Sequence, residues 1–335
     1  MAALAAVALL AGCSAEAPPS PQASPSPDYT STYEATPPTE LAPLRGTSVP
    51  EGSLPHAALV AKIDNHWDAR PQVGLERTDI VYEELVEGGI TRYVAVWHSD
   101  IPELLGPIRS IRPMDPEIAG SLGGIIFYAG GQPRFVSMMR QTSLYNAIHG
   151  QQDTSAYMYR SGDRSAPHNV IVRAKEFLAA HSDIAAPPQQ FAYSLDAASS
   201  TAAKEGSPTA TLRLAFSTQF VPTWTWDAAS ARYLRWQDGA PDVDSAGDQL
   251  SAVNVVTLRV PVTNGYGVPK TELLGSGEAW ITTGGATVHG SWHKDSIAAP
   301  ITLLDDRGIT VRLGAGNTWV ELVPLDGSVA IEPPA

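Results

Sequence analysis

Residues 57–72 read AALVAKIDNHWDARPQ, and this stretch decides how the chain is interpreted. Residues 57–63 are apolar apart from one lysine, a pattern that predicts a buried strand. The strand runs straight into a dense group of polar side chains. Open α/β sheets commonly bind ligands at the carboxyl ends of their strands, so we expect a ligand site here. A loop whose Asp and Asn satisfy their own backbone is the alternative. The candidate ligand-binding residues are Asp64, Asn65, Arg70 and Gln72.

Predicted strands and helices alternate up to about residue 185. Runs of Val, Ile and aromatic residues predict further strands at 80–85, 91–98 and 125–128. Helix-start residues and amphipathic spacing predict helices from Asp115 through Leu122, from Pro133, and within 172–181. From about residue 210 onward the chain reads as strands separated by Gly and Asp turns such as DDRG. The sequence therefore predicts an α/β half followed by a β-rich half.

The N-terminus has the pattern of a lipoprotein signal. Residues 1–10 are almost wholly apolar and lead into Leu-Ala-Gly-Cys, in which Cys13 is the only cysteine of the chain. The apolar stretch is too short to span a bilayer permanently, so we expect cleavage and lipidation at Cys13. This assignment leaves no thiol for a disulfide, for catalysis or for zinc.

Composition divides the chain into five segments. Residues 14–50 are rich in Pro, Ser, Ala and Thr and cannot bury enough apolar surface to offset their ordering entropy, which predicts a disordered tether. The expected organisation is a lipoprotein signal at 1–13, the tether at 14–50, an N-terminal α/β domain at 51–185, a linker at 186–209 and a β-rich C-terminal domain at 210–330.

The charge balance limits the possible partners. A formal net charge of -13 disfavours nucleic-acid binding by bulk electrostatics, because such a surface repels phosphate backbones. The segment between Lys62 and Arg173 is nevertheless close to neutral, and nearly all of its basic residues are arginines, whose planar fork suits carboxylate and phosphate groups.

Two acidic residues in YEELVEGGITR, residues 82–92, are candidates for acid–base chemistry. Glu83 and Glu87 share one face of a strand and would also meet on a helix. Two carboxylates on one surface can act as general acid and base, because their proximity separates their pKa values. The alternative is a structural network with the nearby arginines Arg92, Arg109 and Arg112.

Two later motifs could supply an anion-binding wall. GPIRSIRP contains Arg109 and Arg112, and RSGDRSAPHN contains Arg164, His168 and Asn169. Guanidinium, imidazole and amide groups would suit glycan carboxylates, phosphates or peptide C-termini. His168 is the histidine that we expect to act as proton carrier or ligand-binding donor, if any does. A structural histidine held by its Pro-His-Asn turn is the alternative, and the sequence favours it slightly.

The sequence lacks several motifs that would fix a reaction. It has no Gly-x-Ser-x-Gly elbow, no His-Glu-x-x-His helix, no Walker loop and no Gly-x-Gly-x-x-Gly fingerprint. A metal site built from Asp64, His66, Glu87 and His168 has no ligand spacing in its favour. We therefore expect no metal and no cofactor.

Long ordered motifs resemble the YerB-like lipoprotein family, whose domain has no established function. In the first half these are AKIDNHWDARPQVGLERTDIVYEELVEGGITRYVAVW, GPIRSIRP and RSAPHNV, and in the second half YLRWQDGAPDVDSAGDQLSAVNVVTLRV, LLGSGEAWITTGG, GSWHK and GNTWVELVP resemble its companion C-terminal domain. The resemblance implies a mixed α/β (α+β) layered sandwich of β-sheets with a helical layer. It transfers no catalytic residues. One departure is Asp242, where the family pattern favours His.

Three functions stay open at this stage. The first is a membrane-anchored extracytoplasmic lipoprotein that binds a polar or anionic cell-envelope ligand, such as a cell-wall glycan or peptide, through a cleft lined by arginines and acids. The second is an envelope-polymer hydrolase or lyase that uses Glu83 or Glu87 with His168. The third is an assembly partner for other envelope proteins, which needs only a complementary surface.

Overall fold

A computed structural model of the chain describes residues 34–334, and the chain from Pro38 onward forms one compact unit. The predicted signal with Cys13 and residues 14–33 of the predicted tether lie outside the described residues. The rest of that tether is partly folded, because β1 (Thr39–Leu41) and β2 (Ser48–Pro50) form a hairpin. Leu44 in its loop is fully buried in the core. The folded unit therefore begins before residue 51, where the sequence placed its start.

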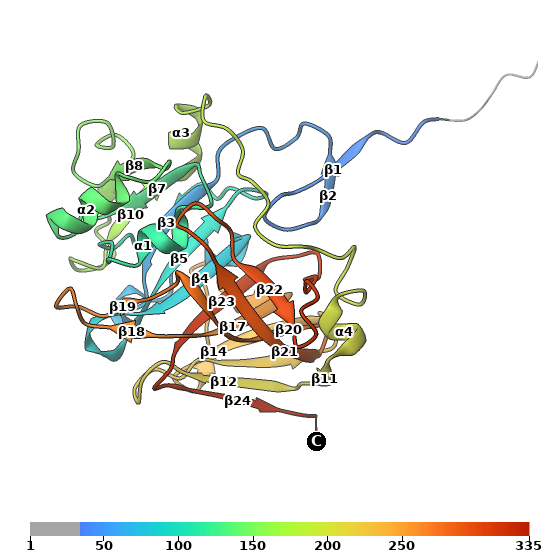
Figure 1. Cartoon of the computed structure of the whole chain (residues 1–335). Coiled ribbons are helices and arrows are strands. Elements are labelled where there is room, and N and C mark those ends of the chain that lie inside the picture. The colour runs from blue at the N-terminus through green and yellow to red at the C-terminus, as the bar shows by residue number, and fades with distance from the viewer. Residues whose placement is uncertain (1–33, 335) are drawn as a thin grey trace, which may run out of the picture. The chain divides into compact units, whose positions relative to one another are not determined.

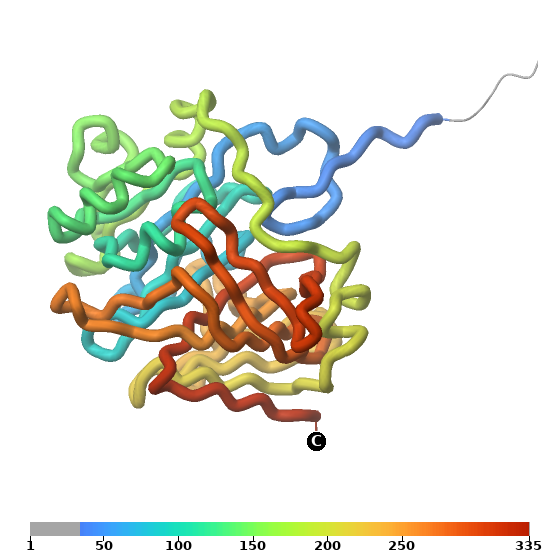
Figure 2. The backbone as a smooth tube through the Cα atoms, in the orientation of Figure 1, coloured from blue at the N-terminus to red at the C-terminus, as the bar shows by residue number. Residues whose placement is uncertain are grey.

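A single eleven-stranded sheet unites the two halves of the chain. β23 pairs in parallel with β4, and this pairing joins the C-terminal strands to the N-terminal ones. Figure 2 shows the same arrangement, with orange-to-red segments beside the cyan ones. In order across the sheet the strands are β11 (Ser207–Pro208), β21 (Ala286–Lys294), β20 (Gly275–Thr283), β17 (Asn254–Val260), β23 (Thr318–Pro324), β4 (Ile80–Leu85), β5 (Thr91–Trp97), β3 (Leu59–Asp64), β7 (Ile125–Tyr128) and β8 (Tyr145–Ile148), with β22 (Thr302–Asp305) paired to β21.

The remaining strands form smaller sheets around this one (Figure 1). A six-stranded sheet contains β15 (Ala240–Pro241), β14 (Arg232–Gln237), β13 (Thr223–Asp227), β12 (Thr211–Ala215) and β24 (Ser328–Glu332), with β16 (Ser251–Ala252) paired to β14. A three-stranded sheet contains β6 (Leu104–Leu105), β10 (Val170–Arg173) and β9 (Met158–Arg160), and β18 (Val262–Thr263) pairs with β19 (Lys270–Thr271).

Helices are few and short. The α-helices are α1 (Asp115–Ala119), α2 (Pro133–Met139), α3 (Ala174–Ala179) and α4 (Thr201–Glu205), and the 3₁₀ turns are η1 (Trp67–Ala69), η2 (Leu75–Arg77) and η3 (Glu87–Gly89). No helix within residues 34–334 is both long and apolar enough to cross a bilayer.

Two hydrophobic cores cover the two faces of the large sheet. On one face, Ile118 of α1 and Phe135 of α2 share a core with Tyr82 of β4. On the other face, Trp224 of the six-stranded sheet and Phe177 of α3 share a core with strand residues of β4 and β5. β3, β4 and β5 are buried on both faces, which explains why their apolar residues do not alternate with exposed polar ones. The layered, sheet-dominated α+β fold expected from the sequence is confirmed.

Local predictions hold best where the core alone sets the structure. β4 and β7 have the predicted bounds, whereas α1 ends at Ala119, three residues before Leu122. Asp115 does not cap α1 as predicted but lies buried in its first turn. Its carboxylate instead accepts hydrogen bonds from Lys62 Nζ at 2.7 Å and from the backbone N–H of Arg112 at 2.6 Å, because a buried lysine needs a partner more than the helix needs a cap.

Candidate functional site

Asp64 is the last residue of β3, and its carboxylate joins three segments that are far apart in the sequence. Its Oδ2 accepts hydrogen bonds from Nδ1 of His168 at 2.6 Å and from Nε of Arg109 at 2.9 Å, and its Oδ1 accepts one from the backbone N–H of His66 at 3.2 Å. Asp64 is fully buried, whereas Arg109 and His168 are partly exposed. The structure thus brings together the polar strand end and the two basic motifs. We call Asp64, His66, Arg109 and His168 the Asp64 cluster.

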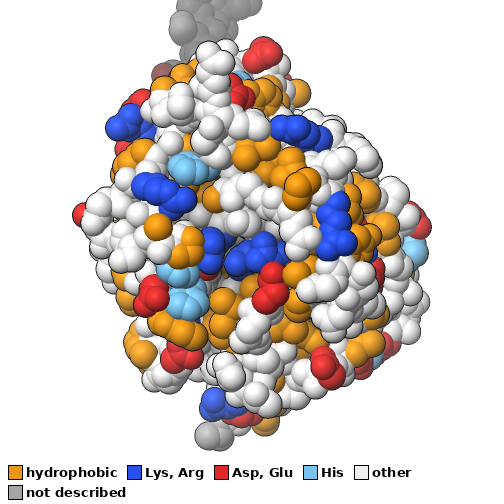
Figure 3. All heavy atoms as spheres, turned by 90° about the vertical axis from the view of Figure 1, so that its left-hand side faces the viewer, with side chains coloured by type: hydrophobic (Ala, Val, Ile, Leu, Met, Phe, Trp, Pro, Cys, Tyr) orange, Lys and Arg blue, Asp and Glu red, His pale blue; other side chains and the backbone are white. Residues whose placement is uncertain are grey.

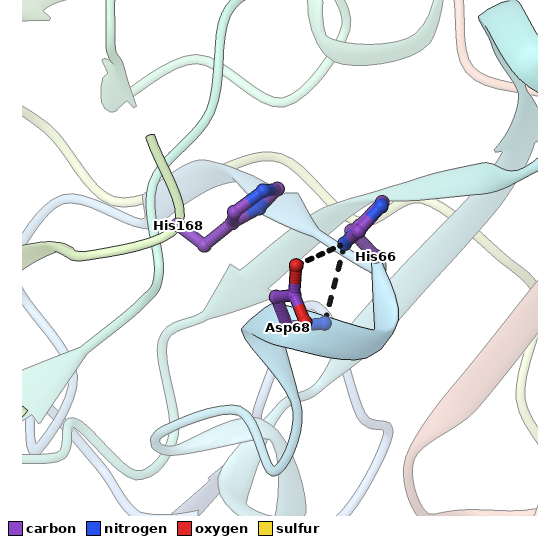
Figure 4. A group of neighbouring side chains, drawn as sticks. All are labelled: His66, Asp68 and His168. Carbon is purple, nitrogen blue, oxygen red and sulfur yellow. Dashed lines mark hydrogen bonds and ion pairs between the residues drawn. The ribbon is translucent and has the colours of Figure 1, made fainter. Parts of the chain in front are cut away.

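The turn η1 supplies the outer part of this cluster. The His66 ring caps η1 by accepting from the backbone N–H of Asp68 at 3.2 Å, and it stacks on His168 with 4.5 Å between ring centroids and 19° between ring planes. Figure 4 shows the two imidazoles and Asp68 together. Burial and the neighbouring His168 ring lower the pKa of His66. Trp67 packs against His66, with 4.0 Å between the ring centroids, and is 61% exposed.

Arg92 and Arg112 bond to groups outside the Asp64 cluster. Arg92 stands opposite Asp64 in the β3–β5 register, and its Nη1 donates to the carbonyl of Ser110. Burial and the charge of Arg112 lower the pKa of Arg92 to about 10. Arg112 donates through Nε to Glu87 at 2.7 Å. Although burial opposes the shift, the bond from Arg112 holds the pKa of Glu87 below its ordinary value.

Asn65 and Gln72 point inward and brace the loop. Gln72 donates to the carbonyl of Asp64 at 3.1 Å and to the side chain of Asn65 at 3.0 Å, and Asn65 donates to Thr91 Oγ1 at 2.9 Å. Both side chains are fully buried. We therefore assign them to the support of the Asp64 loop, because a buried amide with these partners is not presented to a ligand.

Arg164 and Asn169 line a small pocket beside the cluster. The pocket has a volume of about 190 Å³, and its other lining residues include Tyr159, Ser161 and Asp163. Asn169 donates to the carbonyls of Ser161 and Arg164 at 3.0 Å each, and Arg164 donates to the carbonyl of Pro71. The Asn169 bonds hold the 160–169 loop together, and the Arg164 bond fixes it against the 64–72 loop.

Arg70 is paired at the surface. It donates to Asp238 at 2.8 Å from a position against the Phe220 ring.

Glu83 belongs to a closed network between sheets and does not pair with Glu87. It is fully buried, accepts from Thr91 Oγ1 at 2.5 Å and lies 2.8 Å from the Arg235 guanidinium. Arg235 is also bonded to Asp242 at 2.9 Å, so this carboxylate forms part of the network as well. Burial and the nearby Glu83 raise the pKa of Glu321, on β23, well above its ordinary value. We call Glu83, Arg235, Asp242 and Glu321 the Arg235 network.

Two kinds of residue were not predicted from the sequence. Trp67 and Asp68 lie within residues 57–72, and their position next to His66 in His-Trp-Asp was the available signal. Arg235 offered none, because its role depends on packing between two sheets. Among residues 34–334, His66, Asp68 and His168 can bring one metal-ligating atom each to within 4.8 Å of one another. Glu87 is instead engaged by Arg112.

The face of the molecule on the left of Figure 1 is rich in basic groups. Viewed directly in Figure 3, it shows Lys, Arg and His side chains gathered near its middle, with hydrophobic side chains beside them. A surface of this kind suits an anionic ligand that also carries an apolar face.

Comparison with known proteins identifies the family but no activity. Residues 44–186 match the N-terminal domain, and residues 212–320 the C-terminal domain, of a protein of unknown function, DUF3048. The chain belongs to the DUF3048 family. A relative named "Putative lipoprotein YerB" from Bacillus subtilis is 23% identical to this DUF3048 protein over 295 residues, which cover 84% of this chain and 86% of the relative.

A solved structure supports the fold of this DUF3048 protein. The crystal structure of the YerB protein from Bacillus subtilis matches it with a TM-score of 0.75 at 21% identity, covering 87% of this chain and 99% of the solved one. The family resemblance read from the sequence motifs is thereby confirmed. At this identity the match establishes the arrangement of the strands and assigns no ligand.

Proposed function

We propose that this DUF3048 protein is a lipid-anchored lipoprotein on the extracytoplasmic face of the cell membrane, and that its Asp64 cluster binds an anionic ligand of the cell envelope. The anchor rests on Leu-Ala-Gly-Cys13 after an apolar stretch and on the lipoprotein name of the YerB relative. Muropeptides are the ligand class that fits best, because they combine carboxylates with sugar rings.

The single observation that carries the binding proposal is how Asp64 holds its two basic partners. It engages Arg109 only through Nε, and the terminal guanidinium nitrogens of Arg109 meet no acceptor within residues 34–334. It engages His168 through Nδ1, which leaves Nε2 available. The buried carboxylate therefore orients the terminal N–H groups of Arg109 toward solvent as donors, as a preorganised carboxylate-binding site requires.

Trp67 adds a second feature that favours a sugar-containing ligand. Its side chain is 61% exposed and lies against His66, and tryptophan is enriched at interfaces because it combines a large apolar surface with a polar N–H. A sugar ring stacked on Trp67 would lie beside His66, a member of the Asp64 cluster. The enzyme alternative has weaker support, because Glu83 is enclosed and Glu87 is paired with Arg112.

Isothermal titration calorimetry of the full chain with purified muropeptides tests this function. The titrations are done in the presence of EDTA, so that no metal contributes. We expect saturable heat with the wild type. Arg109→Gln and Trp67→Ala should each lower the muropeptide affinity by about tenfold or more, since each variant removes one contact with the ligand.

Arg213→Gln is the matched control. Arg213 is likewise a surface arginine paired through Nε to a carboxylate, that of Glu332 at 2.9 Å, but it lies in the six-stranded sheet. The Arg213→Gln variant should bind muropeptides with the affinity of the wild type. Absence of heat with muropeptides and with teichoic-acid fragments would reject the ligand proposal and favour a protein partner. The anchor is tested separately: Cys13→Ser should move the protein from the membrane fraction to the soluble fraction.

A further inference from the structure

We propose that His66, Asp68 and His168 form a Zn²⁺ site with one coordination position open to solvent. This inference goes beyond the anion-binding function and does not depend on it. It also departs from the sequence-based expectation that the protein holds no metal. The three side chains come from the turn after β3 and from the loop before β10, and their ligating atoms lie within 4.8 Å of one another (Figure 4).

The strongest support is the carboxylate behind His168. Asp64 accepts the Nδ1–H of His168 at 2.6 Å, which fixes the tautomer of the imidazole and leaves the lone pair on Nε2. Metal-ligating histidines almost always donate their other ring nitrogen in this way. Asp64 is held in turn by Arg109 and by the backbone of His66. His168 is thus oriented as a metal ligand by a buried, fully engaged carboxylate.

The other two ligands stand on one short turn. His66 and Asp68 flank Trp67 at the start of η1, and His66 Nδ1 lies 3.5 Å from Asp68 Oδ2. Tetrahedral ligands around Zn²⁺ are separated by roughly 3.3 Å, since each bond is about 2.0–2.2 Å long. The two ligating atoms that lie farthest apart must therefore approach each other by about 1.5 Å when the ion binds. Asp68 is free to move, because its side chain is 65% exposed.

Binding also requires His66 to turn out of its stack with His168, since two nearly parallel imidazoles cannot direct their lone pairs to one ion. This rotation of the His66 ring breaks one hydrogen bond, that between the Asp68 N–H and His66 Nδ1. His168 keeps its bond to Asp64 throughout. The ion would then have three protein ligands and an open position for water, as in catalytic rather than structural zinc sites.

The local charges permit a divalent cation. Asp64 compensates Arg109 at 2.9 Å, so the negative charge of Asp68 stays available for the ion. Two imidazoles with one carboxylate suit Zn²⁺ and related first-row metals, whereas Mg²⁺ and Ca²⁺ prefer all-oxygen sets.

Competition of the full chain against a chromogenic zinc chelator tests the site, with Co²⁺ as a spectroscopic substitute. We expect one Zn²⁺ per chain and visible Co²⁺ absorption of the intensity typical of tetrahedral coordination. His168→Gln and His66→Asn should each weaken binding by at least 100-fold. Asp64→Asn should weaken it by about 10- to 100-fold, because it removes only the partner behind the ligand.

His293→Asn is the control, because His293 is also a surface histidine beside a carboxylate, that of Asp295 at 2.6 Å. Its zinc affinity should be unchanged. Absence of saturable zinc binding, or wild-type affinity in the His66→Asn/His168→Gln double variant, would overturn the site. If His168→Gln proves unfolded by circular dichroism, His66→Asn decides, since Asn keeps the cap of η1. Muropeptide titrations in EDTA report on the anion site independently.

Discussion

The Asp64 cluster and the Arg235 network both pair carboxylates with an arginine, but they differ in exposure to solvent. In each, a carboxylate on a central strand meets an arginine from a distant segment, at 2.9 Å for Asp64 with Arg109 and 2.8 Å for Glu83 with Arg235. Arg235 is fully buried and lies 4.8 Å from the centre of the Trp319 ring, whereas Arg109 is 22% exposed. In the network every charge faces protein, while in the cluster donors are left over.

This difference separates structural from functional charge. A buried ion pair contributes little net stability compared with an apolar replacement, but loss of one partner leaves an uncompensated charge in the core. The Arg235 network therefore fixes how the six-stranded sheet packs on the large one. The Asp64 cluster contributes less to this packing and can bind. Substitutions should accordingly affect the folding of one region and the binding of the other.

The largest effect is expected from Arg235→Met. The variant keeps much of the side-chain volume but leaves Glu83 and Asp242 buried without their cation, which should lower the free energy of unfolding by about 3–5 kcal/mol. Urea denaturation followed by tryptophan fluorescence measures this. The exposed Arg213 is the control, where Arg213→Met should cost less than about 1 kcal/mol. Equal costs for the two variants would contradict the distinction.

A smaller loss is expected from Asp64→Asn. The amide keeps the shape of the side chain but removes the charge that holds Arg109 and His168, so unfolding should become easier by about 1–3 kcal/mol. The free energy of muropeptide binding should weaken by at least as much, since the guanidinium of Arg109 loses the partner that orients it. Calorimetry and urea denaturation on the same preparation separate the two effects. A variant that loses stability but keeps full affinity would place Asp64 with the structural charges.

Glu321→Gln should change the pH dependence of stability more than stability itself. The pKa of Glu321 is raised in the folded state, so its contribution is present at pH values below the unfolded pKa of about 4.5 and is lost as pH rises toward the folded pKa. Gln imitates the neutral acid at every pH. The variant should therefore gain stability relative to the wild type as pH increases from about 5 to 8. Parallel curves from thermal unfolding would show that Glu321 is charged in the folded protein.

Sequence patterns predicted individual strands and several residues of the site, but not which charged side chains would be buried. The apolar runs around Val60 and Val81 predicted β3 and β4 because burial alone dictates them. The polar group after β3 was also visible. Glu83 and Glu87 do not share a strand face, because β4 ends at Leu85 and Glu87 lies in η3. The arginine that pairs with Glu83 comes about 150 positions later, on β14. Covering of this kind depends on long-range topology, which single-sequence patterns do not contain.

The smallest effect on stability is expected from Trp67→Ala. Because Trp67 is 61% exposed, its removal should change the free energy of unfolding by no more than about 0.5 kcal/mol. Trp224→Ala is the matched control from the closed region, since this tryptophan is fully buried and donates to Glu321 at 2.7 Å. That truncation should cost about 3–5 kcal/mol.

The two tryptophans therefore allow the most direct comparison of the two regions. If Trp67→Ala loses muropeptide affinity at wild-type stability, its exposure serves binding. If Trp67→Ala instead destabilises the protein as strongly as Trp224→Ala, the turn at the end of β3 is part of the core. The Asp64 cluster would then be a second structural network, because a site that packs like the core leaves no side chain available to a ligand.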